Sequence, residues 1–233
     1  MNKINCVLFD LYNTLFKFYP DREETQYQAS RLIDLKIDKS QFKDAILKSD
    51  SWFAKQTAKK SMHLLNDKEK FLFYCEYEKK LFSHLGQNLS ESEAKKIWTY
   101  VYSQKSSLKK YDDVIPCLKS LKENNFSVGI ITNIDAKGED LIKDLNLSNY
   151  IFKIITSYDA GGSKPSPIIF EYALNIFDCR PSECVFIGDQ IETDIIGARN
   201  SNITPILLDR EDHYDSYEEC KVINNLNELQ FIL

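Results

Sequence analysis

The sequence predicts an α/β protein whose core is a doubly wound parallel sheet, with an all-helical segment inserted after the first strand. Three observations lead to this fold class. Five short apolar runs are typical of buried strands, helical patterns alternate with them from about residue 107 onward, and residues 17–106 show helical periodicity alone. At 233 residues the chain is long enough for such a core with a smaller appendage.

The predicted strands are almost continuously apolar, which is typical of strands buried on both faces of a parallel sheet. They occupy residues 4–9, 127–132, 151–156, 184–188 and 205–208. Apolar residues at helical spacing lie between them and predict helices over residues 114–124, 137–145 and 166–177. Pro167 suits the first turn of the last helix, where its missing N–H costs nothing.

The segment after the first strand lacks any run typical of a buried strand. Phe42 and Ile46 are spaced as on one face of a helix, and Ser90 with Glu93 forms the pattern of a capping box that opens another helix. We therefore expect a core made of residues 1–16 and 107–233, and a helical segment over residues 17–106.

Composition and charge exclude several classes of protein. Hydrophobic residues make up 43% of the chain and charged residues 28%, values that are typical of globular proteins. The formal net charge of −5 leaves no basic surplus for binding nucleic acid. No apolar stretch approaches the ~18 residues of a membrane span, and the N-terminus has no leader-like apolar region. We expect a cytoplasmic protein.

The cysteines give no sign of a disulfide framework or of a common metal motif. None of them forms a C-x-x-C pair, and a chain of this size does not need disulfides. We expect six reduced thiols without a part in the chemistry. They stand at positions 6, 75, 117, 179, 184 and 220.

Polar residues follow several of the predicted strands at the point where each strand ends. In an open α/β sheet these ends face one crevice, where ligands bind. Each residue alone fits ordinary turn chemistry, but their occurrence in order on successive elements favours a site. A lysine in a Gly-Gly-Ser-Lys-Pro loop joins them. The candidates are Asp10, Thr132, Asn133, Lys164, Asp189 and Asp194.

The order and context of these residues resemble the haloacid dehalogenase superfamily. The resemblance runs from residue 4 to about residue 208 and is interrupted by the helical segment. It implies a Rossmann-like core with a helical cap inserted after the first motif, as in subfamily I. The matching residues are Phe9-Asp10-Leu11-Tyr12-Asn13-Thr14-Leu15, Ile131-Thr132-Asn133, Lys164-Pro165 and Ile187-Gly188-Asp189 with Asp194 and Gly197-Ala198.

The resemblance implies a covalent mechanism with a metal ion. Asp10 would attack the substrate and form an ester that water then cleaves. Mg²⁺, which prefers oxygen ligands, would be held by Asp10, Asp189 and the main-chain carbonyl of Tyr12. Asp194 would be a further ligand or an outer-shell orienting group.

Three residues would handle the charge of the transferring group. Lys164 would neutralise charge on the nucleophile and on the phosphoryl group. The Thr132 hydroxyl and the backbone of Asn133 would hold phosphate oxygens. The resemblance thus makes Asp10, Thr132 and Lys164 the expected catalytic residues, and Thr132, Asn133 and Lys164 the expected substrate-binding ones.

Position 12 departs from the phosphatase pattern of the family. Phosphatases usually carry a second aspartate there, which protonates the leaving group, whereas this chain has Tyr12. A tyrosine resembles the 2-haloacid dehalogenase branch, whose halide leaving group needs no proton. Those dehalogenases work without metal and carry a cap arginine. Here Asp189 and Asp194 favour Mg²⁺, and we expect Arg22 and Arg31, the arginines of the helical segment, at the surface.

The sequence therefore predicts a Mg²⁺-dependent phosphatase that acts on a small phosphorylated metabolite through an aspartyl-phosphate intermediate. A 2-haloacid dehalogenase-like hydrolase, a phosphonatase and a catalytically weak phosphometabolite-binding protein stay open as alternatives. The expected partner is a small-molecule substrate, without nucleic acid or membrane, and the expected state is a monomer or a homodimer.

Overall fold

The computed structural model describes residues 3–60, 62–104, 106–214 and 217–233. The chain divides into two compact units. An α/β unit comprises Met1–Lys17 and Lys110–Leu233, and a helical unit comprises Phe18–Lys109. The α/β unit is therefore discontinuous in sequence, whereas the helical unit is one uninterrupted segment.

Six strands of the described chain form one sheet in the order β5-β4-β1-β6-β7-β8, and all neighbouring pairs are parallel. This confirms the predicted doubly wound sheet. The strands are β1 (Cys6–Phe9), β4 (Ser127–Thr132), β5 (Lys153–Thr156), β6 (Cys184–Gly188), β7 (Thr204–Leu208) and β8 (Lys221–Ile223).

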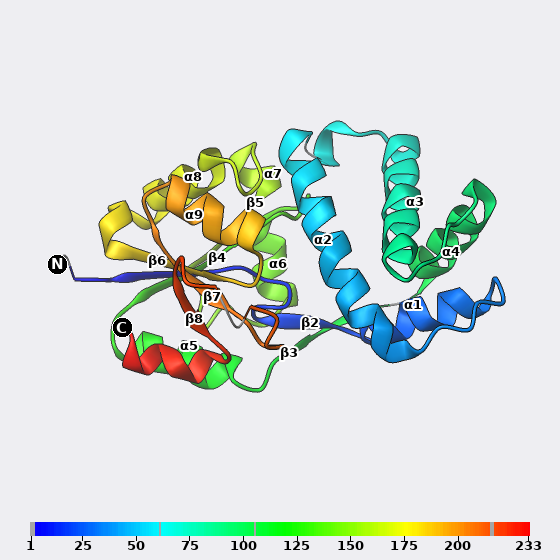
Figure 1. The fold of residues 1–233 in the computed structure, drawn as a ribbon. Helices are drawn as coiled ribbons and strands as arrows, with labels where there is room; N and C mark the ends of the chain where they lie inside the picture. Colours follow the sequence, from blue (N-terminus) through cyan, green and yellow to red (C-terminus); the bar gives the residue numbers. More distant parts are fainter. Residues whose placement is uncertain (1–2, 61, 105, 215–216) are drawn as a thin grey trace. The chain divides into compact units, whose positions relative to one another are not determined.

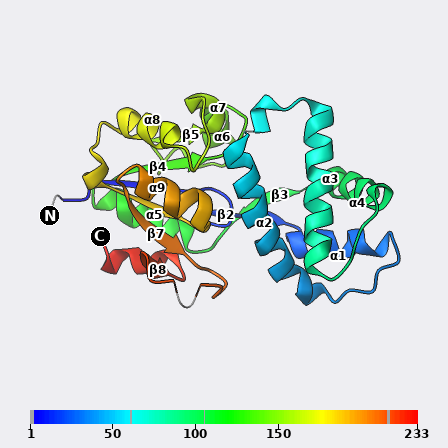
Figure 2. The ribbon, with the colours of Figure 1, turned by 45° about the horizontal axis from the view of Figure 1, so that its top comes forward.

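Helices cover both faces of this sheet. Helices α8 and α9 lie on one face, and α5 with the C-terminal 3-10 helix η5 lies on the other (Figures 1 and 2). The three predicted helices are confirmed as α5, α6 and α8. The bounds are α5 (Val114–Glu123), α6 (Gly138–Asp144), α7 (Ser157–Ala160), α8 (Pro167–Phe177), η3 (Pro181–Glu183), η4 (Ile191–Ile195), α9 (Ile196–Asn200) and η5 (Leu226–Phe231).

The core under α8 consists of apolar side chains from neighbouring strands and from the helix. Leu8 of β1 and Phe186 of β6 are fully buried there against Phe170 and Ala173 of α8. The Phe170 and Phe186 rings meet edge to face with centroids 5.3 Å apart, a preferred aromatic geometry. This packing explains why the strands read as continuous apolar runs.

Strand β1 lies at the centre of the sheet, and the chain proceeds from it in both directions. Phe9 is in register with Ile130 of β4 on one side and with Ile187 of β6 on the other. Such a reversal of strand order is a topological switch point, and ligands bind outside the carboxyl ends of the strands there. The residues that follow β1, β4 and β6 are therefore brought to one edge.

Two parts of the fold differ from the sequence prediction. A small second sheet pairs β2 (Phe16–Tyr19) with β3 (Ser107–Lys110), so a strand enters the segment that was expected to be helical throughout. Most residues of β2 and β3 are partly or fully exposed, so neither strand produces a continuous apolar run. Strand β8 has three residues, which is too short for a pattern to identify.

The helical unit is built from four α-helices and two short 3-10 segments among the described residues. The predicted capping box of Ser90 and Glu93 is present at the start of α4. Phe42, Phe82 and Ile97 are fully buried in its core. The bounds are α1 (Arg22–Arg31), η1 (Lys39–Gln41), α2 (Phe42–Lys59), η2 (Met62–Leu64), α3 (Asp67–His84) and α4 (Glu91–Ser103).

Arg22 is partly exposed, but it is more than the surface residue that the sequence suggested, because partners on two other helices hold it. Its guanidinium makes two hydrogen bonds to the Asp50 carboxylate, of 2.6 and 2.8 Å, and donates another to the Tyr77 hydroxyl at 2.6 Å. The arginine thereby joins α1, α2 and α3 through a bidentate pair, which is stronger than a single-point ion pair. Arg31 is exposed, as predicted.

Within the described residues, no helix has the length and apolar character that crossing a membrane requires.

Candidate active site

Three aspartates come together at the carboxyl edge of the sheet. Asp10 follows β1, Asp189 follows β6, and Asp194 lies in η4, one turn further on. One carboxylate oxygen from each lies within 4.8 Å of the other two. The switch point at β1 produces this grouping from residues that are far apart in the sequence.

Lys164 neutralises part of this charge. Its Nζ donates to Oδ1 of Asp10 at 2.5 Å and to Oδ1 of Asp194 at 2.6 Å. The lysine is 2% exposed and Asp10 is 8% exposed, so the pair is shielded from solvent. The ammonium group also lies 5.2 Å from the centre of the Phe186 ring, within cation–π range.

The side chain of Asn133 holds the backbone of Lys164. Asn133 Nδ2 donates to the Lys164 carbonyl at 2.9 Å, and the Lys164 N–H donates to Asn133 Oδ1 at 2.7 Å. This reciprocal pair fixes the loop that carries the lysine. The sequence had assigned a role only to the backbone of Asn133. The amide clamp was missed because no local pattern links residues on separate strands and loops.

Asp194 is held tightly from several sides. Its Oδ2 accepts from the Gln190 N–H at 3.0 Å, and its Oδ1 accepts from the Thr193 hydroxyl at 3.4 Å as well as from Lys164. A Cβ placed on Gly188 would lie 2.4 Å from Asp194 Oδ2. The carboxylate therefore occupies the space that any side chain at position 188 would need.

Asp189 has partners in the turn after β1. The buried Thr14 hydroxyl donates to Asp189 Oδ1 at 3.4 Å. The Thr14 carbonyl accepts from Arg210 at 2.8 Å, and Arg210 makes a bidentate pair with Asp113 at 2.9 and 3.0 Å. Sequence reasoning gave none of these three residues a role. Thr14 could have been found, because it is a polar residue inside the first motif.

Two further candidates lie beside these groups along the chain. Thr132 is the last residue of β4, the strand next to β1, and is 1% exposed. Tyr12 lies in the turn two residues after Asp10 and is half-buried. The structure thus gathers Asp10, Lys164 and the other two aspartates directly. Tyr12 lies in the turn after Asp10, and Thr132 and Asn133 lie at the end of β4, next to β1.

The electrostatics of the site show an excess of negative charge. Burial raises the pKa of Asp10 to about 6, with Lys164 opposing the shift and Asp194 adding to it. Burial, followed by the charges of Asp10 and Asp194, raises the pKa of Asp189 well above its ordinary value. Burial disfavours the charged form of Lys164, but the two aspartates outweigh this and raise its pKa. One ammonium group balances the charge of three carboxylates only in part, and this arrangement favours the binding of a further cation.

The fold and the site define an α/β protein with three carboxylates and a buried lysine at the carboxyl edge of a parallel sheet. Residues 4–202 match the haloacid dehalogenase-like hydrolases. The chain belongs to this family, as the sequence predicted, and is an enzyme of the hydrolase class.

Among individual relatives, a glyceraldehyde 3-phosphate phosphatase from Methanothermobacter thermautotrophicus is 29% identical over 143 residues. The alignment covers 58% of this chain and 63% of that protein, so it spans less than two thirds of the relative's length.

Two solved structures share the fold over nearly the whole chain. A phosphatase of the superfamily from Thermococcus onnurineus superposes with a TM-score of 0.58 at 22% identity and covers 98% of this chain and 97% of its own. The L-2-haloacid dehalogenase from Xanthobacter autotrophicus gives 0.62 at 17% identity, with 98% of each chain covered. Because a phosphatase and a dehalogenase share this fold, the choice between the two reactions depends on the site.

Proposed function

We propose that this hydrolase is a Mg²⁺-dependent phosphatase that acts on a small phosphorylated metabolite through an aspartyl-phosphate at Asp10. The observation that carries the proposal is the cluster of three carboxylates around a single buried lysine. The similarity to a protein named as a sugar-phosphate phosphatase supports the substrate class. We also propose that Phe18–Lys109 serves as the cap that determines specificity, as the family resemblance implies.

The donor atoms fit a hard divalent cation. Asp10 and Asp189 have carboxylate oxygens within one small space and would hold the ion together with the main-chain carbonyl of Tyr12 in the turn after β1. Both oxygens of Asp194 already accept hydrogen bonds, which favours a position outside the ligand shell for that residue. Mg²⁺ in this site would lower the repulsion between an anionic nucleophile and an anionic phosphate.

The protein's own groups account for the two chemical steps. An Asp10 oxygen attacks phosphorus, and the bond to the leaving oxygen breaks with its electron pair. Water then attacks the aspartyl-phosphate, releasing inorganic phosphate and regenerating the carboxylate. Lys164 stays beside the reacting oxygen and balances its charge, while the Thr132 hydroxyl and the Asn133 N–H donate to phosphate oxygens.

Tyr12 determines which leaving groups are accepted. With no carboxyl group at this position, the departing oxygen must leave as an anion or take a proton from solvent. A phenol, with a reference pKa of about 10, is a far weaker acid than a carboxyl group and therefore a poor proton donor to the departing oxygen. We therefore propose that acyl and aryl phosphates are favoured over alkyl phosphates.

The second candidate is a 2-haloacid dehalogenase, and Tyr12 is the observation that favours it. Two features weigh against it. Asp189 and Asp194 add negative charge next to Asp10, which halide displacement does not need. Arg22, the partly buried arginine of the helical unit, is already engaged by Asp50 and Tyr77.

The test is hydrolysis of an aryl phosphate by the purified protein with Mg²⁺ and with EDTA. We expect turnover with Mg²⁺, none with EDTA, and none in Asp10→Asn, which keeps the size of the side chain but removes the nucleophile. Asp112→Asn, a change at an exposed aspartate of the same unit, is the control and should keep full activity.

Three results would reject the proposal. Turnover that survives in Asp10→Asn would exclude the nucleophile. Halide release from a 2-haloacid, unaffected by EDTA and without phosphate release from any ester, would establish the second candidate in its place. Tight binding of phosphate esters without any turnover would identify a binding protein.

A further inference from the structure

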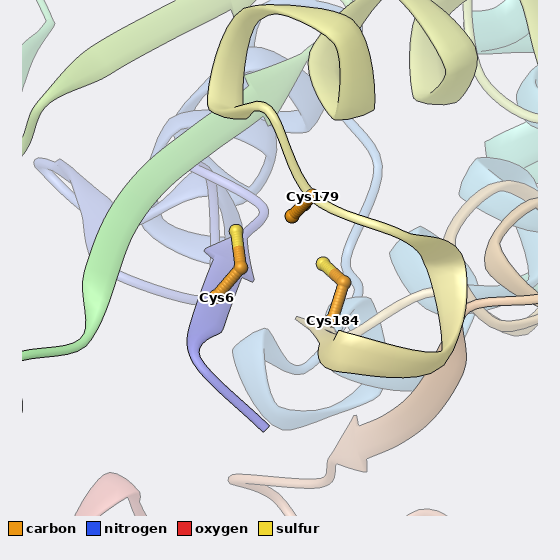
Figure 3. A group of neighbouring side chains, drawn as sticks. All are labelled: Cys6, Cys179 and Cys184. Carbon is orange, nitrogen blue, oxygen red and sulfur yellow. The ribbon is translucent and has the colours of Figure 1, made fainter. Parts of the chain in front are cut away.

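Three of the six cysteines meet at one point of the α/β unit. Cys6 is the first residue of β1, Cys184 is the first residue of β6, and Cys179 lies in the segment between α8 and η3. Their sulfur atoms all lie within 4.8 Å of one another. Figure 3 shows the three side chains coming together from these three segments.

The cluster is separate from the carboxylate site. Cys6 and Cys184 are in register on adjacent parallel strands and stand at the amino ends of those strands. Asp10 and Asp189 follow the carboxyl ends of the same two strands. A strand advances about 3.3 Å per residue, so the length of the strands separates the two groups of side chains.

Burial in this cluster is uneven in a way that suits a ligand site. Cys6 and Cys184 are fully buried, whereas Cys179 is partly exposed. The two buried thiols belong to the apolar cluster under α8, which excludes water, and Cys179 packs against it from the open side. An ion could therefore enter past Cys179 and be held in a dry environment.

Packing alone accounts for a single buried cysteine but not for this convergence. An isolated buried cysteine behaves as a small apolar residue, and Cys117, which is buried on α5 outside the group, fits that description. Three thiols from three segments, grouped at ligand distance with one open to solvent, have the makeup of a metal site.

We propose that Cys6, Cys179 and Cys184 bind one thiophilic closed-shell metal ion, Zn²⁺ or Cu⁺. Each metal–sulfur bond would be about 2.3 Å, which places the sulfurs roughly 4 Å apart in either trigonal or tetrahedral geometry. On binding, the thiols release their protons to solvent and three sulfur–metal bonds form, with no transfer of electrons.

The two ions differ in what else they need. Cu⁺ is satisfied by three thiolates, whereas Zn²⁺ takes a fourth ligand. Water on the exposed side of Cys179 is available for that position. Either ion would tie β1 and β6 to the segment after α8. The inference does not depend on the phosphatase proposal, because none of its residues belongs to the carboxylate site.

The test uses the full chain, reduced with a phosphine and kept in excess Mg²⁺ so that the carboxylates are occupied. Zn²⁺ and Cu⁺ are titrated separately against a competing chelator, and native mass spectrometry counts the bound ions. We expect one ion per chain and protection of the three cysteines from alkylation. The ion that binds more tightly in the competition is the one assigned to the site.

The informative variant is Cys179→Ser, because this side chain is on a connecting segment and its loss leaves the two strands intact. We expect its affinity to fall more than about 100-fold, since losing even an outer partner of a metal site costs 10- to 100-fold. Cys220→Ser is the matched control, another partly exposed cysteine of the same unit, and should bind as the wild type does. Circular dichroism establishes that both variants are folded, and Cys179→Ala replaces the serine variant if that one is not.

Three outcomes would overturn the proposal. In the first outcome, neither ion binds at one per chain. In the second, the Cys179 variants bind the ion as tightly as the wild-type protein does. In the third outcome, Asp189→Asn abolishes binding, which would place the ion at the carboxylates instead.

Discussion

Glu78 is a buried acid whose proton should stabilise the helical unit. It is 0% exposed on α3, and Gln26 Nε2 donates to its Oε1 at 3.1 Å. Glu78 Oε2 and Gln26 Oε1 are buried and make no hydrogen bond within the described part of the chain. Burial raises the pKa of Glu78 from 4.5 to about 7, opposed by the Gln26 hydrogen bond and the Arg22 charge. A proton on Glu78 would provide a donor for the unsatisfied Gln26 oxygen.

The direction and size of the pH effect follow from that shift. The folded protein holds this proton more tightly than the unfolded chain does, so the stabilisation is complete below pH 4.5. It is lost as the pH rises from 4.5 through about 7. A shift from 4.5 to about 7 corresponds to roughly 3 kcal/mol, as an upper limit for a single buried group. Glu78→Gln mimics the protonated acid and should remove this loss.

The assay is urea unfolding followed by tryptophan fluorescence at several pH values. Both tryptophans of the chain, Trp52 and Trp98, belong to the helical unit, so the signal reports on that unit selectively. We expect Glu78→Gln to match the wild type near pH 4 and to be more stable above pH 7. Glu76→Gln, at an exposed position of the same helix, is the control. A difference between Glu78→Gln and the wild type that stays constant from pH 4 to 8 would refute the reasoning.

Three further predictions concern the carboxylate site. Gly188→Ala should displace the Asp194 carboxylate from Lys164, because the new methyl group would overlap that carboxylate. We expect initial rates to show at least a tenfold loss of phosphatase activity, and thermal unfolding to show destabilisation of about 1–3 kcal/mol. Asn133→Ala removes both hydrogen bonds to the Lys164 backbone, which are worth about 1 kcal/mol each. The variant should therefore lower kcat roughly 30-fold, and an unchanged kcat would show that other contacts hold the loop. Tyr12→Asp should raise the rate of hydrolysis of alkyl phosphates by up to about 10²- to 10⁴-fold, with little change for aryl phosphates. Equal rates of the wild-type protein on the two classes of substrate would contradict the role assigned to this position.

The central strands and their ends could be predicted from the sequence because their signals are local. A strand buried on both faces must be apolar along its whole length, so β1, β4 and β6 stand out as short hydrophobic runs. A polar residue directly after such a run is equally visible, and Asp10 and Asp189 were found in this way. The roles given to these residues in catalysis and metal binding stay predictions.

The features that could not be predicted depend on contacts between distant segments. Arg22 appears in the sequence as one charged residue among many, and its ion pair depends on Asp50 on the next α-helix along the chain. The amide clamp of Asn133 likewise needs the position of Lys164. Strand β8 contains too few residues for a pattern.

The cysteine cluster belongs to the same class of hidden features. The spacing of the cysteines matches no metal motif, so no sequence pattern groups Cys6 with Cys179 and Cys184. Only the register of β1 with β6, together with the path of the chain after α8, brings the three sulfurs into one place.

The division into one continuous and one discontinuous unit determines the order in which the chain can fold during synthesis. The helical unit is one uninterrupted segment that ends at Lys109, so it can fold before the α/β unit is complete. Strand β1 precedes both of its neighbours along the chain, so it lacks them until Ser127–Thr132 and then Cys184–Gly188 have been synthesised. An apolar strand thus stays unpaired until the segments that flank it in the sheet have been made. During that interval β1 is exposed to aggregation.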